Sequence, residues 1–211
     1  MPFPDEIAPV EVLPHRAHWA GDFDLLAAEL SAALGPLALA VDHVGSTSVP
    51  GLAAKDCVDI QVRVAAPPEP ASLAPPLTAL GYRLRPEPWN RKELSGGVSC
   101  RKLVFAPPVG AAVRHNVHLR AHDGPNARFA LLFRDHLRAD AAARDAWGAF
   151  KTRLVRSAPD LFEYGQIKAS ATTVLMLAAE RWAADTGWRV PPPPARPPTG
   201  PASGGVGPGT D

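Results

Sequence analysis

The sequence predicts an α+β fold in which a small mixed β-sheet is flanked by helices and followed by a helical C-terminal part. Two segments, 57–64 and 113–120, alternate between apolar and polar residues, which is typical of strands with one buried face. Beyond Gly124, apolar residues recur at three- and four-residue spacing, which is typical of amphipathic helices. At 211 residues the chain is long enough for one domain with its own hydrophobic core.

The first predicted element is an amphipathic helix over residues 16–34, which Gly35-Pro36 would end. Its apolar positions recur at helical spacing: Trp19, Phe23, Leu26, Leu30 and Ala33. Alternation over residues 37–42 predicts a strand that leads into a Gly-Ser turn at 45–51. The strand over 57–64 follows, with Asp59, Gln61 and Arg63 on its polar face.

Residues 67–99 are predicted to be less regular. A short helix over 71–80 is interrupted by Pro75-Pro76, which should kink or shorten it, and Gly81 suits the position after its end. A strand at 82–85 follows. Residues 86–99 contain Gly96-Gly97 and show no periodicity, so we expect a mobile loop there, which could act as a lid over the site.

Paired strands are predicted at 100–106 and 113–120, separated by a Pro-Gly turn. Three helices should follow, from Gly124 to Leu137, from Ala141 to Arg156, and from the capping residue Asp160 to about Ala184. The tail from Pro191 contains eight prolines and five glycines in 21 residues, so we predict disorder there. The predicted domain therefore covers residues 1–188 and the tail residues 189–211.

Four residues of the Gly-Ser turn, Gly45, Ser46, Thr47 and Ser48, are candidates for binding a phosphate group. Gly45 permits close approach of the backbone, and the hydroxyls and N–H groups could hold an anion if a short helix begins there. The alternative is an ordinary connection whose hydroxyls satisfy the turn. Lys55 lies four residues before Asp59 and could neutralise a ligand phosphate or pair with that carboxylate.

A second polar face carries Asn116, His118 and Arg120 on the strand 113–120. If this face is the one shared with Asp59, these side chains complete a site, with Asn116 and Arg120 binding ligand. Otherwise they are solvated polar residues. His118 could also be a metal ligand together with Asp59, although imidazole suits transition metals better than magnesium.

The stretch HVGSTSVPGLAAKDCVDI, from His43 to Ile60, resembles the signature of the GrpB family within the nucleotidyltransferase-like superfamily. The resemblance continues in residues 115–120, in residues 133–154 and in the pair Tyr164 and Lys168. It implies a nucleotidyltransferase-like fold in which the turn holds nucleotide phosphates and a D-x-D or D-x-E pair binds Mg²⁺ or Mn²⁺. Asp59 and Lys55 would then be the catalytic residues. This chain departs from the pattern, because Gln61 stands where a second carboxylate is expected.

Composition narrows the possible partners. The net charge of +1 argues against a general nucleic-acid binder, and no apolar run is long enough to span a membrane. The two cysteines, Cys57 and Cys100, lack CxxC spacing, which suggests a reducing compartment and a cytoplasmic location. Residues 81–120 hold eight basic and two acidic residues, either a solvated face or a positive wall opposite the Gly-Ser turn.

Three hypotheses of function remain. The first is a protein that binds a nucleotide or another phosphorylated ligand and catalyses nucleotidyl or phosphoryl transfer with an incomplete metal site. The second is a non-catalytic binding module linked to coenzyme A metabolism, since the family is similar to an extra domain of some dephospho-coenzyme-A kinases, although this chain has no Walker P-loop. The third is an interaction protein that uses its basic face and Pro-rich tail. The sequence leaves the oligomeric state open.

Overall fold

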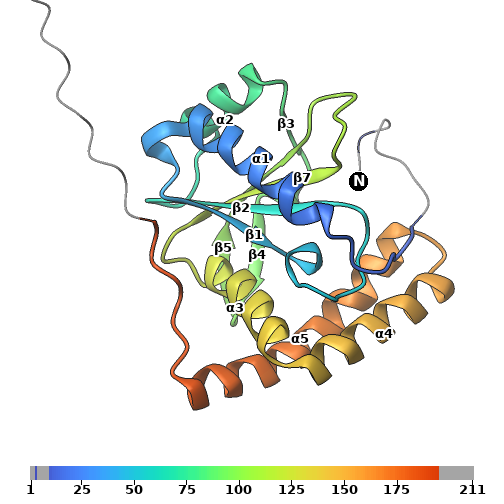
Figure 1. The fold of residues 1–211 in the computed structure, drawn as a ribbon. Helices are drawn as coiled ribbons and strands as arrows, with labels where there is room; N and C mark the ends of the chain where they lie inside the picture. Colours follow the sequence, from blue (N-terminus) through green and yellow to red (C-terminus); the bar gives the residue numbers. More distant parts are fainter. Residues whose placement is uncertain (1–2, 4–9, 195–211) are drawn as a thin grey trace, which may run out of the picture.

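The computed structural model describes Phe3 and residues 10–194 and contains five α-helices within that part of the chain (Figure 1). Each predicted helix is present within about three residues of its expected bounds. The helices are α1 (His18–Leu34), α2 (Pro70–Ala79), α3 (Pro125–Ala139), α4 (Ala141–Ser157) and α5 (Leu161–Thr186). Pro75 and Pro76 lie inside α2 without ending it, and Asp160 caps α5 by accepting a hydrogen bond from the backbone N–H of Glu163.

The centre of the fold is a five-stranded mixed sheet. Its strands are β1 (Ala40–Val44), β2 (Val58–Val64), β3 (Arg83–Leu84), β6 (Leu103–Ala106) and β7 (His115–Ala121). Their order across the sheet is β1-β2-β7-β6-β3, and only the central pair β2–β7 is parallel. The prediction of a small mixed sheet flanked by helices is therefore confirmed.

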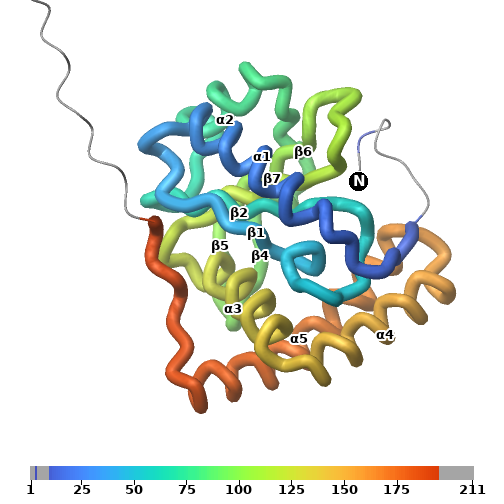
Figure 2. The backbone as a smooth tube through the Cα atoms, in the orientation of Figure 1, coloured from blue at the N-terminus to red at the C-terminus, as the bar shows by residue number. Residues whose placement is uncertain are grey.

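Helices cover both faces of this sheet, as Figures 1 and 2 show. The apolar face of β2 packs under α1 and α2, in a core that includes Trp19, Leu30, Ile60 and Leu77. A second core joins α3, α4 and α5 to the loop after the Gly-Ser turn, through residues such as Leu52, Leu132, Trp147 and Met176. The polar face of β2 therefore lies inside the molecule, between the sheet and the second core.

Three predicted elements differ from the structure. The strand expected at 100–106 is divided at Lys102, so that its first residues belong to β5 (Val98–Arg101) and the rest to β6. The first strand begins at Ala40, three residues later than expected, because Gly35–Leu37 form a 3-10 turn with Pro36 near its start. Residues 86–99 are not an irregular loop. They contain a short 3-10 helix, Pro88–Asn90, and most of an antiparallel hairpin formed by β4 (Lys92–Ser95) and β5 (Val98–Arg101). Gly96 and Gly97 both have positive φ and form its two-residue turn.

Beyond α5 the chain turns back toward the sheet (Figure 2). The carbonyl of Pro191, within the predicted tail, accepts a hydrogen bond of 2.8 Å from Nη1 of Arg63 on β2. The rest of that predicted tail, residues 195–211, lies outside the described residues. None of the helices described here combines the length and hydropathy that crossing a bilayer would require.

Candidate functional site

The two polar strand faces predicted from the sequence are one continuous face. Because β2 and β7 are parallel and in register, Asp59 lies beside Asn116, Gln61 beside His118, and Arg63 beside Arg120. Nδ2 of Asn116 donates to Oδ1 of Asp59 over 3.3 Å. The expectation that Asp59 shares its face with residues 116–120 is confirmed.

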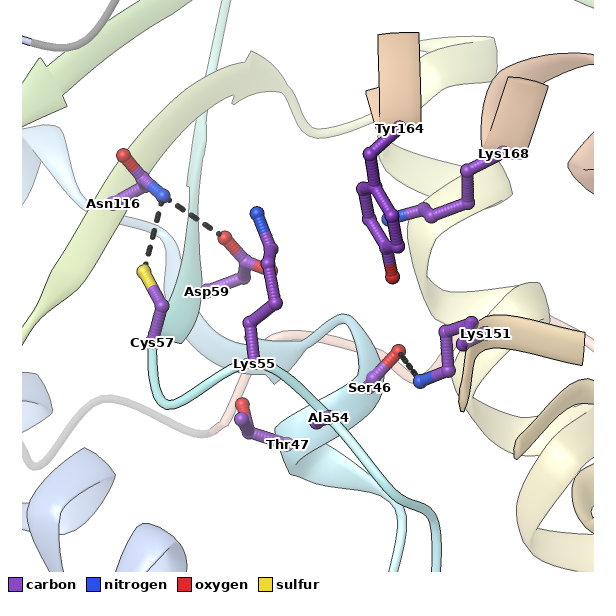
Figure 3. A pocket seen from close by; sticks show the side chains of 10 residues that line it. All are labelled: Ser46, Thr47, Ala54, Lys55, Cys57, Asp59, Asn116, Lys151, Tyr164 and Lys168. Atoms are coloured by element: carbon purple, nitrogen blue, oxygen red, sulfur yellow. Dashed lines mark hydrogen bonds between the residues drawn. The ribbon is translucent and has the colours of Figure 1, made fainter. Parts of the chain in front are cut away.

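The N-terminal end of this face opens into a pocket of about 370 Å³, part of which is open solvent (Figure 3). Four parts of the chain converge on it: the Gly-Ser turn, the loop and strand at 54–59, strand β7, and helices α4 and α5. The lining residues are Ser46, Thr47, Ala54, Lys55, Cys57, Asp59, Asn116, Lys151, Tyr164 and Lys168.

The Gly-Ser turn passes directly over Asp59. Gly45 has φ +70° and ψ −168°, and a Cβ at this position would lie 2.6 Å from Oδ2 of Asp59. Glycine is therefore required here for both backbone conformation and space. A 3-10 helix, η3 (Ser46–Ser48), does begin after it, but three residues supply little of a helix dipole. The positive charge for an anion must come from side chains.

Helix α3 holds this turn in place. The guanidinium of Arg134 donates to the carbonyl of His43, and that of Arg138 donates to the carbonyl of Ser48 over 2.7 Å. Thr47 is bonded to Nε2 of His43 over 3.0 Å, and the hydroxyl of Ser48 donates to the carbonyl of Gly45. Ser46 is thus the hydroxyl of the turn that is not committed to a contact within the turn.

Lys151 of α4 provides the contact to Ser46. Its side chain is buried, with the residue only 2% exposed, and Nζ lies 2.8 Å from Oγ of Ser46. Nζ also donates to the carbonyl of Ala53. Burial lowers the pKa of Lys151 to about 6, helped by the like charges of Lys168 and Lys55 and opposed by Asp59.

Two further lysines lie across the pocket. In Figure 3, Lys55 rises from its loop between Asp59 on one side and Tyr164 and Lys168 on the other. Nζ of Lys55 lies 5.8 Å from the centre of the Tyr164 ring, and no ion pair with Asp59 is present among the described contacts within 4 Å. Burial, with the charge of Lys55, lowers the pKa of Lys168. Burial raises that of Tyr164 to about 12.

Asp59 is the one carboxylate of the pocket lining. Burial works against its charge, but His118, Lys168 and Lys55 outweigh that cost and lower its pKa to about 2. Nε2 of His118 lies 3.7 Å from Oδ1, and Nδ1 of His118 has no hydrogen-bond partner among the described residues. Burial and the neighbouring carboxylate raise the pKa of Cys57 to about 12, so its thiol stays protonated.

The donor set does not fit a resident pair of divalent metal ions. The amide oxygen of Gln61 already accepts from Arg120 over 3.0 Å, and its nitrogen donates to Asp42. The nearest imidazole to Asp59 is that of His118, at 3.7 Å, and three lysines line the same pocket. Over the described part of the chain, no cluster of three or more His, Cys, Asp or Glu side chains could hold a metal.

The structure brings most of the predicted site residues together. Gly45, Ser46, Thr47, Lys55, Asp59 and Asn116 line or border the pocket. Ser48 and Arg120 do not line it. Ser48 is buried beneath the turn, and Arg120 is held by Glu93 of the hairpin over 2.7 Å, so neither reaches a ligand there. Their predicted role in binding phosphate is not supported by their positions.

None of the basic residues in 81–120 lines the pocket, although Nη2 of Arg85 donates to Oδ1 of Asn116, which does. Arg101, Lys102 and Arg120 of that segment form ion pairs with Glu69 and Glu93. The lysines that line the pocket are Lys55, Lys151 and Lys168. Lys151 was not a predicted site residue, and Lys168 was noted with Tyr164 only as part of the family resemblance. One signal was available, because only five of the 22 Lys and Arg residues are lysines and three of these line this pocket.

Comparison with known proteins identifies the family. The sequence matches the family model described as GrpB protein over residues 9–176, which is most of its length. The solved structure of the conserved protein GrpB from Enterococcus faecalis superposes with a TM-score of 0.65 and 26% identity, covering 82% of this chain and 99% of that one. This chain belongs to the GrpB family.

Curated relatives fall into two groups. A protein named dephospho-CoA kinase from Mycolicibacterium paratuberculosis is 33% identical over 198 residues, covering 86% of this chain and 49% of the relative. A UPF0157 protein from Halalkalibacterium halodurans is 31% identical over 175 residues, covering 82% of this chain and 83% of the relative. The chain spans about half the length of the kinase-named relatives that it matches.

Proposed function

We propose that the pocket binds a phosphorylated small molecule or nucleotide and that its phosphate lies among Lys55, Lys168 and the hydroxyl of Ser46. The convergence of three lysines and the partly exposed hydroxyl of Ser46 on one small pocket carries this proposal. Burial disfavours the charged form of Lys168, and an anion relieves that cost by pairing with the ammonium group. A polyphosphate would complement the lysine side.

The opposite wall suits the rest of such a ligand. Asp59 is ionised and can accept a hydrogen bond from a hydroxyl or amine, and Asn116 beside it can donate or accept. A ligand that carries phosphate at one end and hydroxyl groups at the other, as a nucleotide does, would satisfy both walls. The lysines supply the charge that metal ions supply elsewhere, so binding needs no resident metal.

Two functions follow from this site. The first is nucleotidyl or phosphoryl transfer, which the family resemblance to nucleotidyltransferases favours. The second is an accessory module that binds without turnover. The relatives named dephospho-CoA kinase favour a link of this module to coenzyme A metabolism, because dephospho-coenzyme A carries a diphosphate and ribose hydroxyls. The matched region is about half of each such relative, and its contribution to the named activity is part of the proposal.

Calorimetric titration tests the binding step. Inorganic phosphate, pyrophosphate, ADP, ATP and dephospho-coenzyme A would be titrated into the full chain and into Lys55→Met and Lys168→Met. Each substitution should weaken binding about tenfold, the equivalent of about 1.4 kcal/mol. Lys92→Met is the matched control, because Lys92 is exposed on β4 and does not line the pocket.

The same panel separates the two functions. Product release from a bound phosphate donor would favour transfer, and tight binding of dephospho-coenzyme A without turnover would favour the accessory module. The proposal of a phosphate site fails if no member of the panel binds. It fails as well if binding is equally strong in Lys55→Met, Lys168→Met and Lys92→Met.

A further inference from the structure

Ser46 and Lys151 have the arrangement of a nucleophile and its general base. Oγ of Ser46 and Nζ of Lys151 are 2.8 Å apart, although their positions are 105 residues apart in the sequence. The amine is held in turn by the carbonyl of Ala53, which accepts one of its protons. A nucleophile, a base within hydrogen-bond reach and a third group that orients the base are the parts of an activated serine site.

Ser46 is presented to the pocket by the backbone. It directly follows the end of β1 and the glycine with φ +70°, at the sharp turn from a strand into η3. A strand, a strained turn and a helical start also present the nucleophile in serine hydrolases. Ser46 is partly exposed, whereas Thr47 and Ser48 are buried, with their hydroxyls bonded to the ring of His43 and to the carbonyl of Gly45.

Position 151 carries a lysine where most cations of this chain are arginines, and of these two only lysine can act as a base. This chain uses arginine for most of its cations, and Arg63, Arg120, Arg134 and Arg138 make its buried or half-buried contacts to carboxylates and carbonyls. Arginine stays charged in proteins, whereas a buried lysine can lose its proton near neutral pH. A neutral amine that donates to Ala53 keeps its lone pair free to accept the proton of Ser46.

We propose that Ser46 and Lys151 are a catalytic dyad and that the protein transfers a phosphoryl group through a phosphoserine at Ser46. This rests on the proposed phosphate site, and it names the reaction step which that site performs. Lys55 and Lys168 line the same pocket, where they would offset the negative charge of the transferred group.

The step balances without any further reactant. Oγ of Ser46 attacks the phosphorus of a phosphate ester or phosphoanhydride, and its proton passes to Nζ of Lys151. The bond from phosphorus to the leaving oxygen breaks and its electron pair stays on that oxygen. An alkoxide leaving group takes the proton from Nζ of Lys151 and departs as the alcohol, whereas a carboxylate or phosphate departs as the anion. Water or an acceptor hydroxyl then attacks the phosphoserine, and the oxygen of Ser46 takes back a proton.

The charged groups around Lys151 support its role as base. Lys168 from α5 and Lys55 from the loop before β2 disfavour its protonated form, and Asp59 from β2 opposes them less strongly. Burial is the largest cause, and the amine titrates at about 6. Phosphoserine formation should therefore rise about tenfold per pH unit below about 6 and level off above it.

The test uses the full chain with acetyl phosphate, pyrophosphate and ATP as probes. Samples quenched in acid from milliseconds to hours would be analysed by intact mass and by peptide mapping, while calorimetry records which probes bind. We expect one added HPO₃ group on Ser46, none in Ser46→Ala, and unchanged labelling in the control Ser99→Ala, which alters an exposed serine of β5. Lys151→Arg places a permanently charged side chain at this position that cannot act as base, so labelling should slow by about 100-fold or more.

The outcomes separate the dyad from the phosphate site. Binding of a probe without any phosphoserine at Ser46 overturns the dyad and leaves the phosphate site standing. No binding of any probe overturns both. A second measurement covers failure of Lys151→Arg to fold: the ¹⁵N shift of Nζ in the native protein. A neutral amine at pH 8 supports the dyad, and an ammonium at that pH contradicts it.

Discussion

The polar face of β2 behaves differently at its two ends. At the Asp59 end, the carboxylate and three lysines surround a pocket, and the described contacts include no ion pair between any of these lysines and Asp59. At the other end, Arg63 forms an ion pair with Asp42 over 2.8 Å, and Arg120 forms one with Glu93 over 2.7 Å. Both ends carry charge on the same face, but only the second end neutralises it internally.

This difference separates residues that support the fold from residues available to a ligand. Arg63 is 1% exposed and donates to Asp42 through two of its nitrogens, so its charge is satisfied within the protein. Glu93 similarly accepts from Arg120, Lys102 and Asn126, and the first two lower its pKa against the effect of burial. A polar strand residue is thus a good candidate for binding only where its charge lacks an internal partner.

Removing a charge from the end of the face that carries Arg63 and Arg120 should have the largest effect on stability. Arg63→Met would leave the carboxylate of Asp42 half-buried without its ion-pair partner and the carbonyl of Pro191 without its donor. Loss of one partner of a buried pair costs about 3–5 kcal/mol. We expect a decrease of that size in the free energy of unfolding measured with urea, while the phosphate affinity of the folded fraction stays within about twofold.

The double variant Asp42→Asn with Arg63→Met provides the control for that measurement. Removing both charges should restore part of the loss, because no buried charge is then left unpaired. Equal loss in single and double variants would contradict the assignment of this end as an electrostatic support. A large drop in phosphate affinity with normal folding would contradict the separation of the two ends.

The Asp59 end of the face, where Lys151 lines the pocket, should instead make stability depend on pH. The pKa of Lys151 is about 6 in the folded protein and near its ordinary value of 10.5 when unfolded. Between these values the unfolded state binds more protons, so the free energy of unfolding rises with pH by up to about 1.4 kcal/mol per unit. The gain in the free energy of unfolding that is linked to Lys151 is complete above the unfolded pKa of 10.5, and it is lost as pH falls toward the folded pKa of about 6.

Lys151→Met isolates this contribution, because other titrating groups cancel when the two proteins are compared. From pH 6.5 to pH 9 the free energy of unfolding of the native chain should gain about 2–3 kcal/mol relative to that of Lys151→Met. Urea unfolding at four pH values gives the curve. A difference that is flat across this range would mean that Lys151 stays protonated in the folded state.

Much of the fold could be predicted from local pattern. The alternation in residues 57–64 and 113–120 placed β2 and β7 correctly, and their shared polar face followed once the two strands were in register. The hairpin β4–β5 was missed because its strands carry almost no apolar period: Leu94 and Val98 are both exposed. It is anchored instead by Glu93, whose partners lie on β7, on α3 and just before β6.

The site could be predicted only where it is local in sequence. Gly45, Ser46, Lys55 and Asp59 lie within fifteen residues and form a recognisable pattern. The pairing of Lys151 with Ser46 depends on how α4 packs against the loop at 49–52, which no local pattern encodes. The basic segment 81–120 was misleading for the opposite reason, since its charges are close in sequence, but Arg101, Lys102 and Arg120 form ion pairs with Glu69 and Glu93 in space.

The smallest expected effect comes from Asp59, and it has the opposite sign to the others. The carboxylate of Asp59 repels a phosphate in the same pocket, so Asp59→Asn should strengthen the binding of inorganic phosphate by about threefold to tenfold, or up to about 1.4 kcal/mol. Asn keeps the shape of the side chain and can still bond to Asn116.

Asp123→Asn is the matched control, because it removes the same charge just beyond the opposite end of β7. Calorimetry with all three proteins decides the question: equal gains in both variants would reflect net charge alone, and weaker binding in Asp59→Asn would mean that the carboxylate positions the lysines rather than opposing the anion.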